Sequence, residues 1–186
     1  NPAGVTLSEE RRPEIIEICR RHRILIMEDN PYGLLGFEGQ TYTALKTLAP
    51  DDVVYLSSFS KIFAPGYRVG WAVAPPAVRE KMKLASEAAI LCPSSVGQYS
   101  VSTYLDNFDW RLQIEEFRGM YRGRRDAMVS ALGEFMPTCT WNVPAGGFYV
   151  WVGLPDGLDA KDMLPRAVTN LVAYVSGTAF YAGGSA

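Results

Sequence analysis

The chain has 186 residues, of which 48% are hydrophobic and 20% charged, the composition of an ordinary globular protein with room for a buried core. Its formal net charge of −2 excludes a strongly basic surface, so we expect neither nucleic acid nor a membrane as a partner. The three cysteines, Cys19, Cys92 and Cys139, show no C-x-x-C spacing, which predicts reduced thiols in the cytoplasm. The one histidine has no cysteine or second histidine beside it, so we expect no metal site.

The first thirty residues predict a strand that ends close to a carboxylate, Asp29. Residues 1–4 read Asn-Pro-Ala-Gly, a turn by composition, and a helix with Ser8 as its N-cap is expected over residues 8–22. The unbroken apolar run at 24–27 is typical of a parallel strand covered on both faces. Ligands of open α/β sheets bind outside the carboxyl ends of strands, so Asp29 and the nearby Tyr32 become candidates for a site.

A second strand, expected at 53–56, leads into the most informative stretch, residues 57–71, SSFSKIFAPGYRVGW. Its lysine, Lys61, is one of only five in the chain, and burial at a strand end would lower the pKa of its amine, so that a neutral amine could attack a carbonyl. The hydroxyls of Ser58 and Ser60 and the fork of Arg68 suit a phosphate dianion. A lysine beside a phosphate cradle is what pyridoxal 5'-phosphate (PLP) requires, although a surface lysine in a strand-to-loop turn is the simpler alternative.

The remainder of the chain alternates between helical and strand-like patterns, which predicts an α/β sheet. Residues 34–50 are expected to form a loop. The predicted strands are residues 68–74, 139–152 and 172–176. The predicted helices are residues 77–91, 95–105, 108–135 and 160–171, the last interrupted by Pro165.

The pattern S-x-S-K-x-x-x-P-G-x-R-x-G-W around Lys61 resembles the cofactor-lysine signature of the class I/II aminotransferases, PLP enzymes of fold type I. Two more elements follow the order of that family. Asn1 to Gly4 resembles its N-P-x-G motif, and Asp29 with Tyr32 resembles its D-x-x-Y element. Residues 144–148, Pro-Ala-Gly-Gly-Phe, resemble its P-x-G-G-x-F turn, although glycines there also suit a simple hairpin.

The resemblance implies an architecture. Residues 1–112 would be the C-terminal half of the PLP-binding large domain, a mostly parallel sheet flanked by helices. Residues 113–186 would be a small α+β domain, joined to the first by the long helix at 108–135. In this family the full-length protein would be a homodimer.

The resemblance also implies roles for individual residues. Lys61 would form the Schiff base with PLP and move the proton between Cα and C4'. Asp29 would keep the pyridine nitrogen protonated, and Tyr32 and Asn1 would contact the phenolic oxygen. The phosphate would be held by Ser58, Ser60 and Arg68.

The expected function is therefore amino-group transfer between an amino acid and a 2-oxo acid. Two alternatives stay open. A carbon–sulfur lyase could use the same residues, because they serve any cleavage of a Cα–H bond. An aminotransferase-like effector domain of a transcription regulator would need a winged-helix domain upstream.

The resemblance further predicts that the chain is a piece of a longer protein. The family's phosphate loop and ring-stacking aromatic would precede Asn1, and the arginine that binds the substrate carboxylate would follow Ala186. We therefore expect the 186 residues alone to be inactive.

Overall fold

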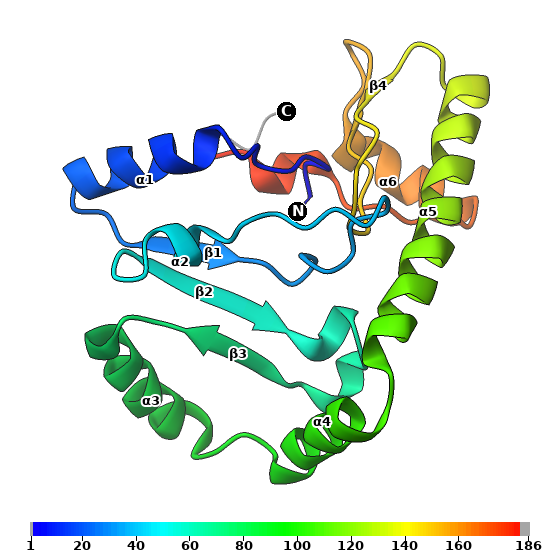
Figure 1. The fold of residues 1–186 in the computed structure, drawn as a ribbon. Helices are drawn as coiled ribbons and strands as arrows, with labels where there is room; N and C mark the ends of the chain where they lie inside the picture. The colour runs from blue at the N-terminus through cyan, green and yellow to red at the C-terminus, as the bar shows by residue number, and fades with distance from the viewer. Residues whose placement is uncertain (1, 183–186) are drawn as a thin grey trace.

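A three-stranded sheet organises the structure, a computed structural model that describes residues 2–182 (Figure 1). Its strands are β1 (Ile26–Asp29), β2 (Val53–Ser58) and β3 (Gly70–Val73), in the order β1-β2-β3. β1 and β2 are parallel, whereas β3 runs antiparallel to β2. The expected α/β class is confirmed, but the sheet of the described residues is mixed and not mostly parallel.

The buried core lies between the sheet and the first two helices, α1 (Arg11–Arg21) and α2 (Leu45–Leu48). Ile16 from α1, Leu45 from α2 and Val53 from β2 form one apolar cluster with Ala49. The β-branched pair Val53 and Val54 is almost fully buried, which accounts for the strand that its sequence predicts. The short helix α2 falls inside the segment 34–50 that we expected to be loop throughout.

Two strands are more exposed than their apolar sequences predict. β1 begins two residues later than expected, and its Met27 is 66% exposed. All four residues of β3 are exposed, including Trp71. The expectation of coverage on both faces is therefore wrong for this chain. An apolar run reveals that a face is suited to burial, but not that the same 186 residues bury it.

The helix α1 begins at Arg11, so Ser8 is not its N-cap; Glu10 occupies that position without a side-chain cap bond. Pro13 then lies in the first turn, where its missing N–H breaks no intrahelical bond. The predicted helices that follow are confirmed within two residues at each end: α3 (Pro76–Ile90), α4 (Ser95–Asn107) and α5 (Trp110–Phe135). The Ser94 side chain accepts a hydrogen bond from the Gly97 amide and so caps α4.

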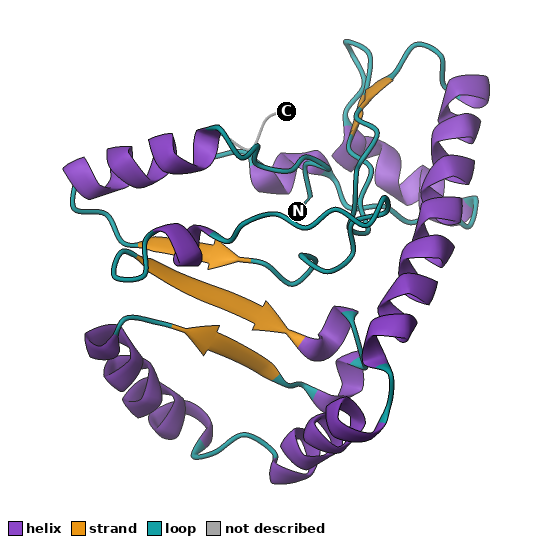
Figure 2. Ribbon diagram, in the orientation of Figure 1, coloured by secondary structure: helices purple, strands orange, loops and turns teal. Residues whose placement is uncertain are grey.

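Beyond α5 the chain is mostly irregular (Figure 2). The strand expected over 139–152 is reduced to the antiparallel pair β4 (Thr140–Trp141) and β5 (Val152–Gly153), because Pro144 and two glycines interrupt the extended run. The strand expected at 172–176 is absent from the described structure. The helix α6 (Ala160–Thr169) continues through Pro165, and the short η3 (Gly177–Phe180) ends the described chain.

None of the helices in residues 2–182 combines the length and the apolar composition needed to cross a membrane.

Candidate functional site

The predicted site residues gather at one edge of the sheet. The carboxyl ends of the parallel strands β1 and β2 lie side by side there, with Asp29 paired with Leu56. Because β3 is antiparallel, its first residue lies at the same edge, where Gly70 pairs with Ser58. Three segments that are distant in sequence therefore present their ends to one region, the place where open α/β sheets bind ligands.

Hydrogen bonds hold the two parallel strand ends together. The Asn30 amide donates to the Leu56 carbonyl at 2.9 Å, one residue past the end of β1. The Ser57 hydroxyl donates to the Asn30 carbonyl at 3.0 Å. These bonds set the position of the segment from Asp29 to Tyr32 relative to the serines of β2.

The serines and the arginine meet around the turn that follows β2. Ser58 caps the 3-10 turn η1 (Phe59–Lys61) by accepting from the Ser60 amide at 3.0 Å, and the two hydroxyl oxygens lie 2.9 Å apart. Ser58 also lies 3.3 Å from the carbonyl of Val69, which follows Arg68 directly in sequence. The structure thus joins Ser58 and Ser60 directly, whereas Arg68 is linked to them only through the backbone of the neighbouring Val69.

Arg68 has an unusual backbone conformation. It closes the turn η2 (Pro65–Tyr67) with a φ of 55°, in the left-handed region that most non-glycine residues avoid. Its side chain is exposed, and its guanidinium donates to the Pro65 carbonyl at 3.4 Å. Non-glycine residues in this conformation cost about 1–3 kcal/mol and concentrate at functional sites.

Lys61 ends η1, three residues beyond the end of β2, and is half-buried. Its ammonium nitrogen lies 5.7 Å from the centre of the Phe148 ring, within the range of a cation–π contact. Other lysines serve elsewhere: Lys46 donates to the carbonyls of Pro50 and Val53, and Lys83 pairs with Glu80 on α3.

Tyr32 lies in an aromatic cluster with Phe148 and Tyr149. Its ring centre is 5.2 Å from that of Phe148 and 6.4 Å from that of Tyr149, both with edge-on geometry. Burial raises the pKa of the Tyr32 phenol to about 12, with further contributions from Tyr149 and Asp29. A tyrosine phenol is protonated at neutral pH even without this shift, so Tyr32 can donate a hydrogen bond.

Sequence reasoning did not single out Phe148 and Tyr149 as site residues. Both follow the glycine pair of the turn 144–147, and with Tyr32 and Asp29 they line a cavity of about 410 Å³. The signal was present in the motif itself, because counting P-x-G-G-x-F from Pro144 puts its final aromatic at Tyr149. Phe148 is the residue that contacts both Tyr32 and Lys61.

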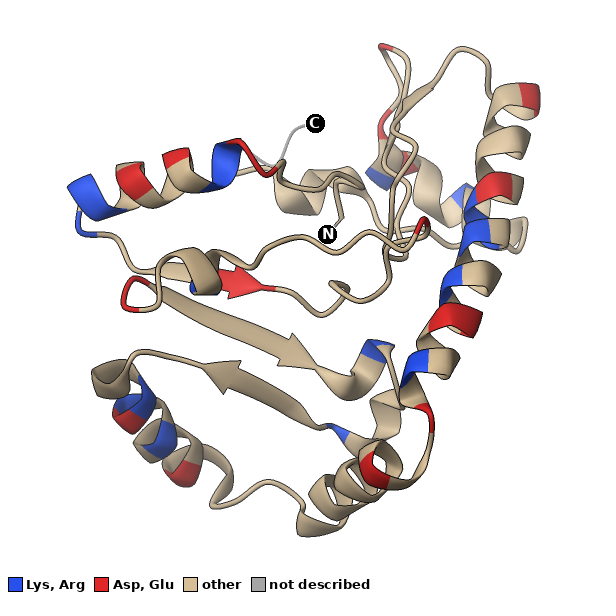
Figure 3. Cartoon of the chain, in the orientation of Figure 1, with Lys and Arg blue, Asp and Glu red and all other residues tan. Residues whose placement is uncertain are grey.

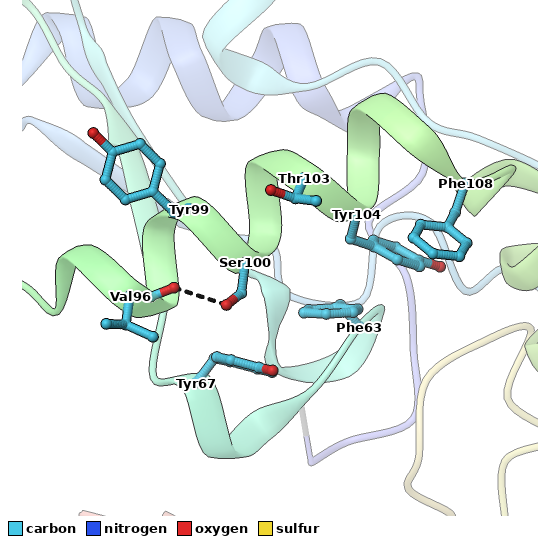
Figure 4. Close-up of a pocket in the computed structure, with 8 residues that line it drawn as sticks. All are labelled: Phe63, Tyr67, Val96, Tyr99, Ser100, Thr103, Tyr104 and Phe108. Atoms are coloured by element: carbon cyan, nitrogen blue, oxygen red, sulfur yellow. Dashed lines mark hydrogen bonds between the residues drawn. The ribbon is translucent and has the colours of Figure 1, made fainter.

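A second hollow, of about 630 Å³, lies beside the lysine turn (Figure 4). Phe63 and Tyr67 face α4 across it, and the Phe63 and Tyr104 rings stack with centres 4.3 Å apart. The remaining lining residues are Val96, Tyr99, Ser100, Thr103 and Phe108. None of the predicted site residues lines it, and it offers no charged group for a phosphate, so it is not the predicted cofactor site.

The structure thus places six of the seven predicted residues, Asp29, Tyr32, Ser58, Ser60, Lys61 and Arg68, at or beside one sheet edge. Asn1 lies outside the described residues. Within residues 2–182 no group of three or more histidine, cysteine, aspartate or glutamate side chains is placed to hold a metal ion.

A lysine, hydroxyls, an arginine and a carboxylate thus follow the strand ends of this α/β sheet, where open α/β sheets bind their ligands. The sequence profile described as "Aminotransferase class I and II" matches residues 1–185. The chain belongs to this family.

Relatives agree in sequence and in structure. The chain is 42% identical to an aromatic-amino-acid aminotransferase of Thermococcus litoralis over 184 residues, 98% of this chain and 44% of that protein. It superposes with a TM-score of 0.94 on the crystal structure of a kynurenine aminotransferase of Pyrococcus horikoshii in complex with PMP. That match, at 44% identity, covers 100% of this chain and 46% of the other. The PLP fold type I architecture of such enzymes is thereby shown for this chain.

A third relative is of a different kind. The chain is 34% identical to an uncharacterised HTH-type transcriptional regulator of Bacillus subtilis over 181 residues, 94% of this chain and 37% of that protein. The chain therefore spans less than half the length of each of these relatives.

Proposed function

We propose that this chain is the lysine-bearing part of a PLP-dependent aminotransferase that moves an amino group between an amino acid and a 2-oxo acid. One observation carries the proposal. The half-buried Lys61 follows Ser58 and Ser60 in the turn η1, and its nitrogen approaches the ring of Phe148, which also contacts Tyr32. Family membership and the PMP-bound relative support it.

The residues present fit the chemistry of PLP. Two hydroxyls and a guanidinium suit a phosphate, and the Asp29 carboxylate suits a protonated ring nitrogen. The phenol of Tyr32, which like any tyrosine is protonated at neutral pH, suits an anionic phenolic oxygen as a hydrogen-bond donor. The polarity of each group is therefore the one that the corresponding part of the cofactor requires.

When bound, the cofactor supplies an electron sink that allows the Cα–H bond of an amino acid to break. The residues of this chain orient it and handle the proton. Ser58, Ser60 and Arg68 would hold the phosphate, and the Asp29 carboxylate would keep the ring nitrogen protonated. The Lys61 amine would be the base that moves the proton from the substrate Cα, while Tyr32, and Asn1 by family resemblance, would contact the phenolic oxygen.

Labelling of the lysine tests the proposal directly. Full-length protein incubated with PLP should, after borohydride reduction and peptide mapping, carry the pyridoxyl group on Lys61. Lys61→Ala should abolish both labelling and transamination, whereas the exposed Lys81→Ala should change neither. A label on Lys46, Lys81, Lys83 or Lys161 would show that the assignment is wrong.

The Bacillus relative is the specific observation that favours a second candidate, an effector domain within a transcription regulator. The full-length gene distinguishes the two, because a regulator must encode a DNA-binding domain upstream. A carbon–sulfur lyase on the same residues is distinguished by its products: ammonia, a thiol and a 2-oxo acid without any need for an acceptor.

We also propose that residues 1–112 belong to a large cofactor-binding domain and residues 113–186 to a small one. The course of α5, which runs from the sheet to β4 and β5, supports this division (Figure 1). The free state of Cys19, Cys92 and Cys139 supports a cytoplasmic location, where thiols stay reduced.

We propose finally that the full-length protein is a homodimer. The apolar hollow beside the lysine turn exposes Val96 and Tyr99, and a surface of this kind marks an interaction site. In sedimentation analysis Tyr99→Lys should lower the dimer fraction, whereas Leu171→Lys, at an even more exposed apolar position away from the hollow, should not. A monomeric wild-type protein would overturn this proposal.

A further inference from the structure

Helix α5 is lined with charged residues along its length (Figure 3), and three of its arginines contact the segment that follows Tyr32. Arg118 is buried and donates from Nε to the Leu34 carbonyl at 2.8 Å. Arg122 and Arg125 both approach the Glu38 carboxylate, at 3.4 and 3.5 Å. These three arginines are spaced by four and three residues, so they lie on one face of α5, and together they hold the loop 34–38.

Arg125 differs from the other two because it also holds the glycine turn. Its Nη1 donates to the Pro144 carbonyl at 2.9 Å, and its guanidinium carbon lies 5.0 Å from the centre of the Phe37 ring. Its side chain is only 13% exposed, whereas that of Arg122 is 48% exposed. Arg125 therefore connects two segments that are more than 100 residues apart.

The loop 34–38 and the turn 144–147 are also joined by backbone contacts with each other. Gly36 and Gly146 form an isolated antiparallel bridge. The Phe37 amide donates to the Ala145 carbonyl at 2.8 Å, and the Gly147 amide to the Leu35 carbonyl at 3.4 Å. We call these contacts the Gly36–Gly146 bridge. It is a very short ladder, so its persistence depends on what holds its two sides together.

The residue after the bridge is Phe148, the aromatic that faces the site. Its ring centre lies 5.2 Å from Tyr32, 4.4 Å from Tyr121 on α5, and 5.7 Å from the Lys61 nitrogen. Any movement of the turn 144–147 would move Phe148 relative to both Tyr32 and Lys61. A misplacement of about 1 Å in such a site can cost on the order of a hundredfold in rate.

We propose that Arg125 is a positioning residue, which holds the Gly36–Gly146 bridge closed and thereby fixes Phe148 in contact with both Tyr32 and Lys61. The proposal rests on the proposed function only for its kinetic consequence. The bridge itself can be measured without cofactor or substrate. Neither Arg125 nor the bridge is among the residues that sequence reasoning assigned to the site.

Hydrogen exchange in the full-length, cofactor-free protein tests the first part. Arg125→Gln should raise the exchange rates of the Phe37 and Gly147 amides by about tenfold or more, because the Gly36–Gly146 bridge should open more often without the contacts of Arg125 to Pro144 and Glu38. Arg122→Gln is the matched control, since it removes a neighbouring contact to Glu38 without touching Pro144. Arg125→Lys, which keeps the charge but not the planar fork, should give an intermediate rate.

The kinetic arm tests the link to Lys61. With cofactor bound, Arg125→Gln should lower kcat by about tenfold with a smaller change in KM, because it disturbs geometry more than substrate contact. Arg125→Lys should recover part of kcat. If Arg125→Gln and Arg122→Gln exchange alike, the proposal is overturned, even where Lys61 labelling and transamination are intact; if Arg125→Gln does not fold, Arg125→Lys is judged against the same control.

Discussion

The charged and polar groups of the site are divided between two strand ends. Asp29 belongs to β1, whereas Lys61 and its serines follow β2. Asp29 is exposed at its strand end, and the protonated Tyr32 stands three residues beyond it. A carboxylate and a neutral donor on one side, and cations with hydroxyls on the other, match the polarity of a phosphorylated pyridine at both of its ends.

Substitution of Asp29 should separate cofactor binding from chemistry. In the full-length protein Asp29→Ala should leave labelling of Lys61 intact but slow amino transfer by about a hundredfold or more, because the ring nitrogen loses its counter-charge. Asp29→Glu should be milder, since the charge remains. Single-turnover rates measure the effect, with the exposed Asp51→Ala as a control that should match wild type. Near-normal turnover in Asp29→Ala would show that this carboxylate ends a strand and has no role in amino transfer.

The site residues close to Lys61 were predictable because they are close in sequence. Ser58, Ser60 and Arg68 lie in one short stretch, in which the turn η1 brings the two serine hydroxyls together. Asp29 and Tyr32 were predictable because a parallel pair of strands aligns its carboxyl ends. Phe148 was not, because its place beside Lys61 depends on how α5 carries the chain back to the sheet, a long-range property that no local pattern encodes.

At the scale of elements, a buried arginine joins α1 to the loops around it. Arg12 is 6% exposed and donates to the carbonyls of Thr43 and Leu7, at 2.7 and 2.9 Å. It lies 3.9 Å from the Glu28 carboxylate of β1, which in turn accepts the amides of Leu45 and Lys46 at the start of α2. One cationic side chain thus connects helix, strand and loop.

Replacing Arg12 should destabilise the fold more than any exposed charge on α1. Removing one partner of a buried charged network leaves the other uncompensated, so Arg12→Met should lower the free energy of unfolding by about 3 kcal/mol. Arg11→Met, at the adjacent exposed position, should change it by less than about 0.5 kcal/mol. Urea unfolding of the full-length protein at pH 7 gives both values. Equal midpoints for the two variants would contradict the role assigned to Arg12.

The elements themselves were predictable to different degrees for physical reasons. A periodic apolar stripe predicts α5, and the structure adds that Asp109 caps its first turn, as Ser94 caps that of α4. The strand expected over 139–152 is wrong for most of its length, because Gly146 and Gly147 make backbone contacts with Gly36 and Leu35 and not with a regular neighbouring strand. The antiparallel orientation of β3 was not predictable either, since an apolar run does not indicate whether a strand pairs in parallel or antiparallel.

At the scale of the whole molecule, much apolar surface faces outward. Trp71 and Val73 on β3, Leu84 and Ile90 on α3, and Tyr99 on α4 are all exposed. The outer edge of β3 lies at the end of the three-stranded sheet, and unpaired strand edges promote association. Since the relatives are more than twice as long, we expect this surface to be covered in the full-length protein.

Residues 1–186 expressed alone should therefore associate or aggregate, hold PLP weakly and fail to transaminate. Contacts from the remainder of the protein act on one preorganised geometry, so their loss should remove far more than half of the activity. Glutamate production from 2-oxoglutarate and an amino acid donor measures this, with full-length protein as the positive control. Glutamate formed by the segment in a Lys61-dependent manner would show that the remaining parts are dispensable.

The Gly36–Gly146 bridge also constrains how the sequence can evolve. A methyl group at Gly146 would lie 2.6 Å from the Leu35 carbonyl oxygen, and one at Gly36 would lie 2.5 Å from the carbonyl oxygen of Gln40. Both obstacles are backbone atoms, which no change of a neighbouring side chain can remove. Compensating pairs of substitutions are thus unavailable, so these two positions should be invariant among homologues and carry no covariation signal, despite being in direct contact.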